Sequence, residues 1–213
     1  TVAVTALSTS SLPFTPKPWL LAMVALLLQT VLHELGHAVS CRVHGVRPRE
    51  LGIALWYGVI PIAYVDRTDA YRVRSRGGRA AISIVGPLQD LCWTGVYGAV
   101  ALGSSGLVHS VAVAATVLGL TMTVVNLNPL LPTDGQQALE AALGELNLRG
   151  RAMAYLAHLV LRNELPTYLK HLTRRRKAVY LMYGTACAVY VLLVVTGMTW
   201  WLLTLGTHLL GGL

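Results

Sequence analysis

The feature that most constrains this chain is a series of apolar stretches long enough to cross a lipid bilayer. A hydrocarbon core about 30 Å thick requires around 20 apolar residues per helix, and such windows lie near 19–41, 80–102, 108–132 and 178–204. Only 12% of the 213 residues are charged and the mean hydropathy is +0.58, whereas an average soluble domain is about 25% charged. The sequence therefore predicts an all-α integral membrane protein with four spans.

The last apolar stretch allows two arrangements. Residues 178–210 are almost uncharged, so they fit either one long helix or a helix followed by a re-entrant or interfacial segment. The prediction is therefore four transmembrane helices, or five if the second arrangement holds.

The basic residues indicate which side of the membrane the loops occupy. Most of the 17 Lys and Arg residues lie in the stretches Arg42–Arg79 and Arg149–Lys177, and the net charge is +8. Because basic loops stay in the cytoplasm, both stretches are expected there and the first residues outside. A nucleic-acid partner is not expected, since the positive charge does not gather on one groove-like face.

Composition divides the chain into four segments. The opening residues are polar and interrupted by proline, while apolar and basic stretches alternate after them. The predicted segments are an extracytoplasmic N-terminal segment (1–18), a membrane core (19–135), a cytoplasmic basic helical segment (136–177) and a C-terminal membrane segment (178–213).

One part of the membrane core differs from the rest. Residues 46–66 carry β-branched and aromatic residues around Gly58 and Pro61, and this composition favours strands over a lipid-exposed helix. A short re-entrant β-hairpin is therefore expected between the first two spans.

The segment HELGH at 33–37 carries the candidate chemistry. Successive residues of an α-helix turn by about 100°, so Glu34 lies about 100° and His37 about 40° from His33, and the three share one face. Two imidazoles one turn apart can bind one zinc ion, and the glutamate between them can act on a zinc-bound water. Three ionisable groups in one membrane helix are costly and usually functional. A catalytic zinc site is predicted, with Glu34 as its general base.

Such a site needs a third protein ligand and an open position for water. His44 lies on the same face but about 10 Å further along the axis than His37, too far to share one ion without a break in the helix. Asp134 follows NLNPLLP at the end of the third apolar stretch, on the same membrane side as HELGH. The prolines interrupt the helix and Asp-Gly favours a turn, so the carboxylate can turn inward. Asp134 is the stronger candidate.

Two groups of residues together resemble a known family. HELGH at 33–37, followed by Asn126, Pro129, Asp134 and Gly135, resembles the site-2 protease family of intramembrane zinc metalloproteases. The resemblance implies a helical membrane core with one buried zinc ion, reached by water from the cytoplasmic side. It also implies a hairpin that presents the substrate as an added strand.

Longer stretches point to one subgroup of that family. YGVIPIAYVDRTDAYRVRSRGGRAAISIVGP and NLRGRAMAYL look like a bacterial subgroup of peptide zinc metalloproteases, which implies a bacterial cytoplasmic membrane. The chain departs from the subgroup at Asp90, where asparagine is usual, at Thr133, where leucine is usual, and at Gln136 and Gln137, where aromatic residues are usual. An acid within a span is costly unless it is protonated, paired or hydrated. Asp90 is therefore expected either to modulate the site or to make a structural hydrogen bond.

The combined prediction is a zinc metalloendopeptidase that cleaves a membrane-associated or precursor peptide, with natural-product maturation as one setting. Expected partners are a peptide or membrane-protein substrate, the lipid bilayer and other membrane proteins. Two alternatives stay open: a non-catalytic zinc-binding component of a peptide export or maturation complex, and a membrane structural protein without metal. Because amides are good neutral donors in a poorly hydrated site, Gln29, Asn126 and Asn128 are candidates for hydrogen bonds to the ligands or substrate. Asp90 is a further candidate for a contact with the site or the substrate.

Overall fold

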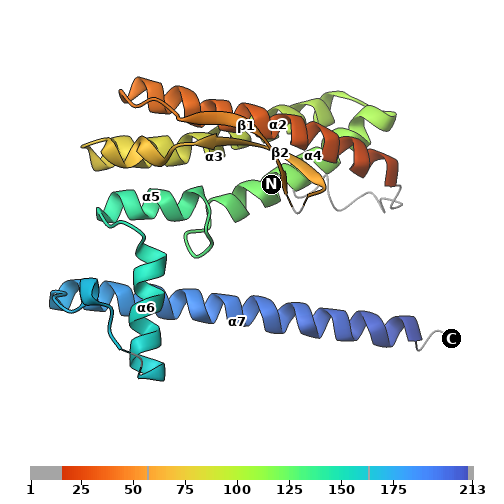
Figure 1. The fold of residues 1–213 in the computed structure, drawn as a ribbon. Helices are drawn as coiled ribbons and strands as arrows, with labels where there is room; N and C mark the ends of the chain where they lie inside the picture. Colours follow the sequence, from red (N-terminus) through yellow and green to blue (C-terminus); the bar gives the residue numbers. More distant parts are fainter. Residues whose placement is uncertain (1–15, 57, 163, 211–213) are drawn as a thin grey trace.

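The computed structural model describes residues 16–210 apart from Tyr57 and Asn163, and most of them are helical (Figure 1). Most of the segment predicted to lie outside the cytoplasm, residues 1–18, is outside the described residues. In chain order the elements are α2 (Pro16–Val43), β1 (Glu50–Trp56), β2 (Ile60–Asp66), η1 (Thr68–Arg72), α3 (Arg76–Gly103), α4 (Gly106–Asn126), α5 (Asp134–Leu143), α6 (Leu148–Leu161), η2 (Thr167–Leu169) and α7 (Arg174–Leu210).

Helices α2, α3 and α4 pack against one another through small residues (Figure 1). Ala22 of α2 lies in one buried cluster with Ala114 and Ala115 of α4. A Cβ atom at Gly119 of α4 would lie 2.5 Å from Thr94 Oγ1 of α3. Membrane helices use such contacts because lipid offers no hydrophobic gain for packing, so close backbone approach supplies the attraction.

Three of the described helices are long and apolar enough to cross a membrane, by length and composition: α2, α4 and α7. The fourth predicted span, near 80–102, is present as α3, a helix of 28 residues, but it is not among these three. Within 80–102, the hydropathy is lowered by Gln89 and Asp90. Helix α3 packs against α2, α4 and α5. The structure thus has three candidate spans, and a fourth span at α3 stays a prediction.

Helix α7 settles the arrangement of the last apolar stretch. It is continuous over 37 residues, so the structure has the first of the two arrangements that the sequence allowed, one long helix. A separate fifth span is not found among the described residues. Beyond its contacts with α6, side chains such as Leu193 and Trp200 are exposed, as lipid-facing residues would be. The beginning of α7 packs on α6 through a core of Leu148, Ala152, Leu169, Tyr180, Tyr183 and Cys187.

The predicted hairpin is confirmed. Strands β1 and β2 have seven residues each and pair antiparallel over their full length. Gly58 in the connecting turn has φ +73°, a left-handed conformation that favours glycine. Strand β2 packs on α2 with Val65 buried, whereas Leu51, Ile53 and Leu55 of β1 are exposed. The free edge of this two-stranded sheet is therefore β1, and the position of the hairpin in a membrane stays a prediction.

Candidate metal centre

Helix α2 presents the two histidines of HELGH toward α3. The Nε2 atoms of His33 and His37 lie 3.1 Å apart, and both rings are buried. Gly36 faces α3, and a Cβ atom there would require the flexible side chain of Gln89 to shift. The i, i+4 spacing on one helix face therefore produces a pair of imidazole nitrogens aimed at one point.

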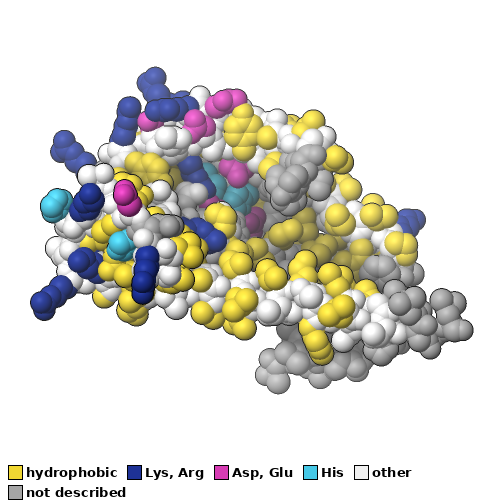
Figure 2. Space-filling model, turned by 60° about the horizontal axis from the view of Figure 1, so that its bottom comes forward, with side chains coloured by type: hydrophobic (Ala, Val, Ile, Leu, Met, Phe, Trp, Pro, Cys, Tyr) yellow, Lys and Arg dark blue, Asp and Glu magenta, His cyan; other side chains and the backbone are white. Residues whose placement is uncertain are grey.

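Asp134 reaches the same point from the start of α5. Its Oδ2 atom lies 3.1 Å from Nε2 of His33 and 3.1 Å from Nε2 of His37. The chain turns back sharply here, and only glycine fits at position 135, because a Cβ atom would overlap the Leu127 backbone. The structure thus brings the three predicted ligands together, and Figure 2 shows histidine and acidic side chains recessed in this face of the molecule.

The hydrogen bonds of the histidines determine which nitrogens carry protons. His33 Nδ1 lies 2.7 Å from Asp90 Oδ2, and His37 Nδ1 lies 2.6 Å from the carbonyl oxygen of Ile82. Both partners can only accept, which assigns a proton to Nδ1 of each ring, and a neutral imidazole then has a lone pair on Nε2. With this assignment Arg67 Nη1, 2.7 Å from His37 Nδ1, makes no hydrogen bond to that atom. With Asp134 Oδ2, three acceptor atoms face one another, an arrangement that a cation satisfies.

The spacing of these atoms fits zinc. Bonds of about 2.0–2.1 Å at tetrahedral angles place neighbouring ligand atoms about 3.3 Å apart, and the three distances here are each 3.1 Å. Two imidazoles and one carboxylate also leave a fourth position, as catalytic zinc sites require. Among the described residues, this is the one group of His, Cys, Asp or Glu side chains found able to hold a metal ion.

Asp90 of α3 belongs to the centre through His33. One oxygen accepts from His33 Nδ1 and the other accepts from Gln29 Nε2 at 2.8 Å. A carboxylate on the far nitrogen of a metal-binding histidine fixes the ring orientation and raises the basicity of the ligating nitrogen. These two contacts also explain how an acid is tolerated at this place in the bundle, because both oxygens are paired.

Gly86 of α3 has no side chain, and this leaves the space that the two imidazole rings occupy. A Cβ atom at this position would lie 2.5 Å from Nε2 of His33 and 2.5 Å from Nε2 of His37. No pattern in the sequence marks this glycine as part of the site, since its role depends on how α3 approaches α2.

The two asparagines predicted near the site have different roles. Asn126 donates from Nδ2 to Asp134 Oδ2 at 3.1 Å and accepts from the Asp134 amide at 3.3 Å, so it orients the ligand. The Oδ1 atom of Asn128 instead accepts from the Leu130 amide at 2.9 Å, which closes a local turn. The structure does not bring Asn128 to the metal centre. His44 is bound to its own helix, with Nδ1 2.8 Å from the Ser40 carbonyl.

Arg67 is a site residue that the sequence did not reveal. It follows β2 directly, and its Nη2 donates to Asp134 Oδ1, while Nη1 lies 2.7 and 2.9 Å from Nδ1 and Nε2 of His37. In the sequence it lies within a long basic stretch that membrane topology already explains. Its place at the end of a strand is the one signal that could have singled it out.

The charges of the centre also fit a divalent cation. Glu34 is half-buried and interacts electrostatically with both histidines, Arg67 and Asp134. Glu34, Asp90 and Asp134 set three carboxylates against one guanidinium, so the centre carries two net negative charges when both histidines are neutral. Buried charge is costly unless compensated, and one divalent ion would balance it.

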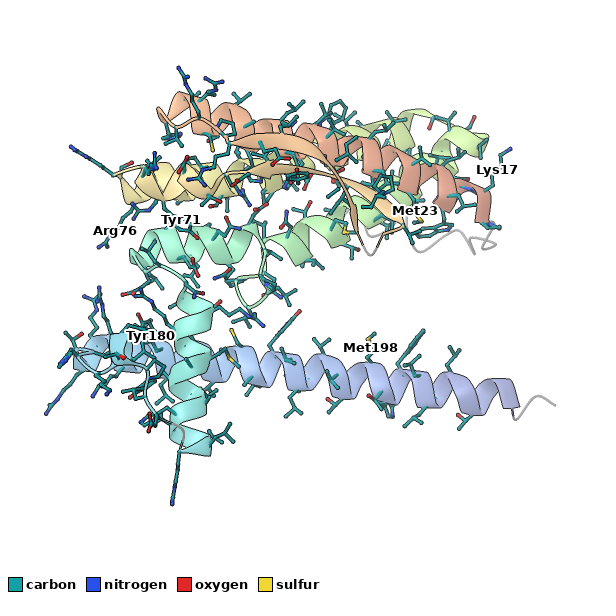
Figure 3. The ribbon with its side chains drawn as sticks, in the orientation of Figure 1. Lys17, Met23, Tyr71, Arg76, Tyr180 and Met198 are labelled. Atoms are coloured by element: carbon teal, nitrogen blue, oxygen red, sulfur yellow. The ribbon has the colours of Figure 1, made fainter. Side chains whose placement is uncertain are left out.

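Two cavities lie beside the centre along α5. The smaller one, of about 30 Å³, is lined by residues that include Arg67, Tyr71 and Gln137, and it has room for about one water molecule. The larger one, of about 510 Å³, also borders Tyr71 and Gln137. Figure 3 shows Tyr71 next to α5. Of these two cavities, the smaller one is lined by Arg67 and thus adjoins that side of the centre.

Comparison with known proteins gives distant and partial similarities. The chain is 31% identical over 133 residues to the "Putative zinc metalloprotease Rip3" of Mycobacterium tuberculosis, covering 59% of this chain and 32% of Rip3. It is 32% identical over 74 residues to the uncharacterized protein MJ0971 of Methanocaldococcus jannaschii, covering 35% of this chain and 20% of that protein. The chain thus spans about a third or less of the length of these relatives. No family model and no solved structure matches it.

Proposed function

We propose that this chain is an intramembrane zinc metalloprotease of the site-2 type that cleaves a membrane-associated or precursor peptide. The observation that carries the proposal is the triangle of His33 Nε2, His37 Nε2 and Asp134 Oδ2 with sides of 3.1 Å. Glu34 lies beside it, on a helix apolar enough to cross a membrane. The distant similarity to a zinc metalloprotease supports the same conclusion.

The side chains of the centre divide the proposed reaction among them. Zinc held by the three ligands would polarise the scissile carbonyl and acidify a water molecule. Glu34 takes a proton as the water oxygen adds to the carbonyl carbon. It returns a proton to the leaving nitrogen as the C–N bond breaks, so a carboxylic acid and an amine result. Asp90 keeps His33 oriented during these steps, and Asn126 keeps Asp134 oriented.

The substrate is proposed to approach along the hairpin. Strand β1 has a free edge, and an extended peptide can add to such an edge through main-chain hydrogen bonds. The exposed Leu51, Ile53 and Leu55 suit an apolar peptide segment. Most of the Lys and Arg side chains visible in Figure 2 gather at one end of the molecule, which supports a cytoplasmic location for that end. Maturation of a peptide natural product and partnership with other membrane proteins belong to the same proposal.

The test is the variant Glu34→Gln in the membrane of an expressing cell. It should retain one zinc per chain but lose cleavage, so peptides that accumulate or disappear with wild-type protein should not change with the variant. Mass mapping of cellular peptides, or of the product of a neighbouring precursor gene, measures both the substrate and the cut. The exposed Glu164 offers Glu164→Gln as a matched control that should cleave normally.

Two outcomes would overturn the proposal. Unchanged cleavage by Glu34→Gln, with zinc bound, would favour a non-catalytic zinc-binding component of an export or maturation complex. Purified wild-type protein without stoichiometric zinc, with a stability that chelators do not alter, would favour a structural membrane protein.

A further inference from the structure

We propose that Arg67 is a positioning residue of the metal centre: it holds Asp134 so that one carboxylate oxygen binds the metal, and it ties the hairpin to the site. The inference rests on the proposed function, because it concerns a ligand of the proposed metal.

The two oxygens of Asp134 face different partners. Oδ2 lies 3.1 Å from the Nε2 atoms of His33 and His37, whereas Oδ1 accepts from Arg67 Nη2. Side-chain exposure is 6% for Asp134 and 17% for Arg67, so water screens this ion pair little. The guanidinium on Oδ1 covers one approach to that oxygen and draws on its lone pairs, so Oδ1 is a poorer metal ligand than Oδ2. Arg67 therefore limits Asp134 to one metal bond and keeps a position open for water.

The second contact of Arg67 changes when a metal binds. Nη1 lies 2.9 Å from Nε2 of His37, and the single lone pair of this nitrogen cannot serve an N–H and a metal together. A metal at Nε2 would therefore require Nη1 to withdraw from His37. Because a guanidinium has five N–H groups in a fixed fork, Nη2 can keep its bond to Asp134 while Nη1 withdraws.

The backbone that carries Arg67 is fixed on both sides. Asp66 Oδ1 accepts from the amide and the hydroxyl of Thr68, at 2.8 and 2.5 Å. Asp69 accepts from Nε and Nη2 of Arg49, at 3.0 and 2.8 Å, and this hydrogen bonding lowers the pKa of Asp69. Arg49 precedes β1 and Asp69 lies in η1, so the pair closes the base of the hairpin. A displacement of the hairpin would therefore reach Asp134 through one side chain.

The test uses the full chain in lipid nanodiscs with Co²⁺ as the probe, because four-coordinate Co²⁺ absorbs visible light far more strongly than five- or six-coordinate Co²⁺. Arg67→Ala should still bind one Co²⁺ but lose visible intensity, since Asp134 can then bind through both oxygens. Arg67→Lys should recover the intensity, because one N–H is enough to hold Oδ1. Arg72→Ala is the matched control: Arg72 lies on the same segment, is exposed and contacts Asp69, and its loss should leave the spectrum unchanged.

A second variant tests the link to the hairpin. Asp69→Asn weakens the pair at the hairpin base without touching the centre, and it should reduce the intensity in the same direction but less than Arg67→Ala. If the Arg67→Ala protein loses helical content, the same measurement is made on Arg67→Met, whose side chain fills a similar volume but has no hydrogen-bond donor. A wild-type spectrum from the donor-free variant would overturn the role of Arg67, and a wild-type spectrum from Asp69→Asn would overturn the link. Wild-type protein that takes up no Co²⁺ or Zn²⁺ would instead refute the proposed function.

Discussion

The molecule buries acidic side chains in two places, and the two are built differently. At the junction of α5, α6 and α7, Glu145 accepts from the Tyr180 hydroxyl at 2.8 Å and pairs with Arg176 at 3.0 Å, where α6 crosses α7 (Figure 3). Every oxygen of Glu145 thus faces a donor. In the metal centre, the Nε2 atoms of His33 and His37 and Oδ2 of Asp134 face one another. Donors from Asn126 and Arg67 reach this triangle only from its edge. An acid buried among donors supports the fold, whereas three acceptor atoms that converge on one point indicate a place for a cation.

Removing Asp134 should produce the largest effect. Asp134→Ala eliminates one of three ligands, so zinc affinity should fall by more than the roughly 10- to 100-fold seen when only a partner of a ligand is lost. Metal analysis after gel filtration measures the effect. Glu145→Ala, the equivalent change in the other cluster, should keep its zinc. Stoichiometric zinc in Asp134→Ala would show that the acceptor triangle is not the metal site.

The second largest effect is expected when the space beside the two histidines is filled. The Cβ of Gly86→Ala would lie 2.5 Å from both Nε2 atoms, whereas a Cβ at Gly95 of the same helix meets nothing within 4 Å. Gly86→Ala should weaken zinc binding by at least about tenfold and cost roughly 1–3 kcal/mol of stability through overpacking. Zinc titration and thermal unfolding measure the two effects. Gly95→Ala should behave as wild type, and equal behaviour of the two variants would contradict the predicted packing.

Removing the charge of Asp90 should have a smaller effect. Asp90→Asn keeps an oxygen that can accept from His33 Nδ1, but it removes the negative charge that raises the basicity of the imidazole. Zinc affinity should fall about tenfold, which competition with a chelator measures. Unchanged affinity would mean that Asp90 supplies a structural hydrogen bond alone.

Changing Glu145 should alter stability and leave the metal in place. Glu145→Gln weakens the bonds to Tyr180 and Arg176, and leaving a buried polar group poorly paired costs about 1–3 kcal/mol. The midpoint of denaturant unfolding measures this loss, and zinc content should stay at the wild-type value. Loss of zinc from Glu145→Gln would remove the distinction between the two clusters.

Hydrophobic periodicity and the order of motifs along the chain predicted the features of the site that depend on local sequence. The i, i+4 spacing placed His33 and His37 on one helix face, and the break after α4 left Asp134 free to turn inward, as the structure has it. Asn128 was predicted at the site, yet its side chain satisfies the amide of Leu130 in its own turn. Short polar side chains next to a turn often bond locally, and composition alone does not distinguish this outcome.

Other features depend on how distant segments approach each other. Arg67 is 67 residues from Asp134 in sequence and meets it only because the hairpin base lies against α2 and α5. Gly86 matters because α3 passes beside two rings of α2. The sequence predicted α3 as a span but not the contacts that its polar residues make, such as that of Asp90 with His33. Such roles follow from tertiary contacts, which one sequence does not display.

The length of helix α7 indicates how deep the metal centre would lie in a bilayer. Its 37 residues extend about 56 Å, well beyond a hydrocarbon layer of about 30 Å, and its first four residues are basic. In a bilayer these four would stay among the headgroups. Tyr183, six residues beyond the last of these four, donates to the Pro129 carbonyl at 2.6 Å. The loop that leads to Asp134 would therefore lie about 9 Å along α7 from the headgroups, and a peptide that reached the centre from that side would first leave the water layer.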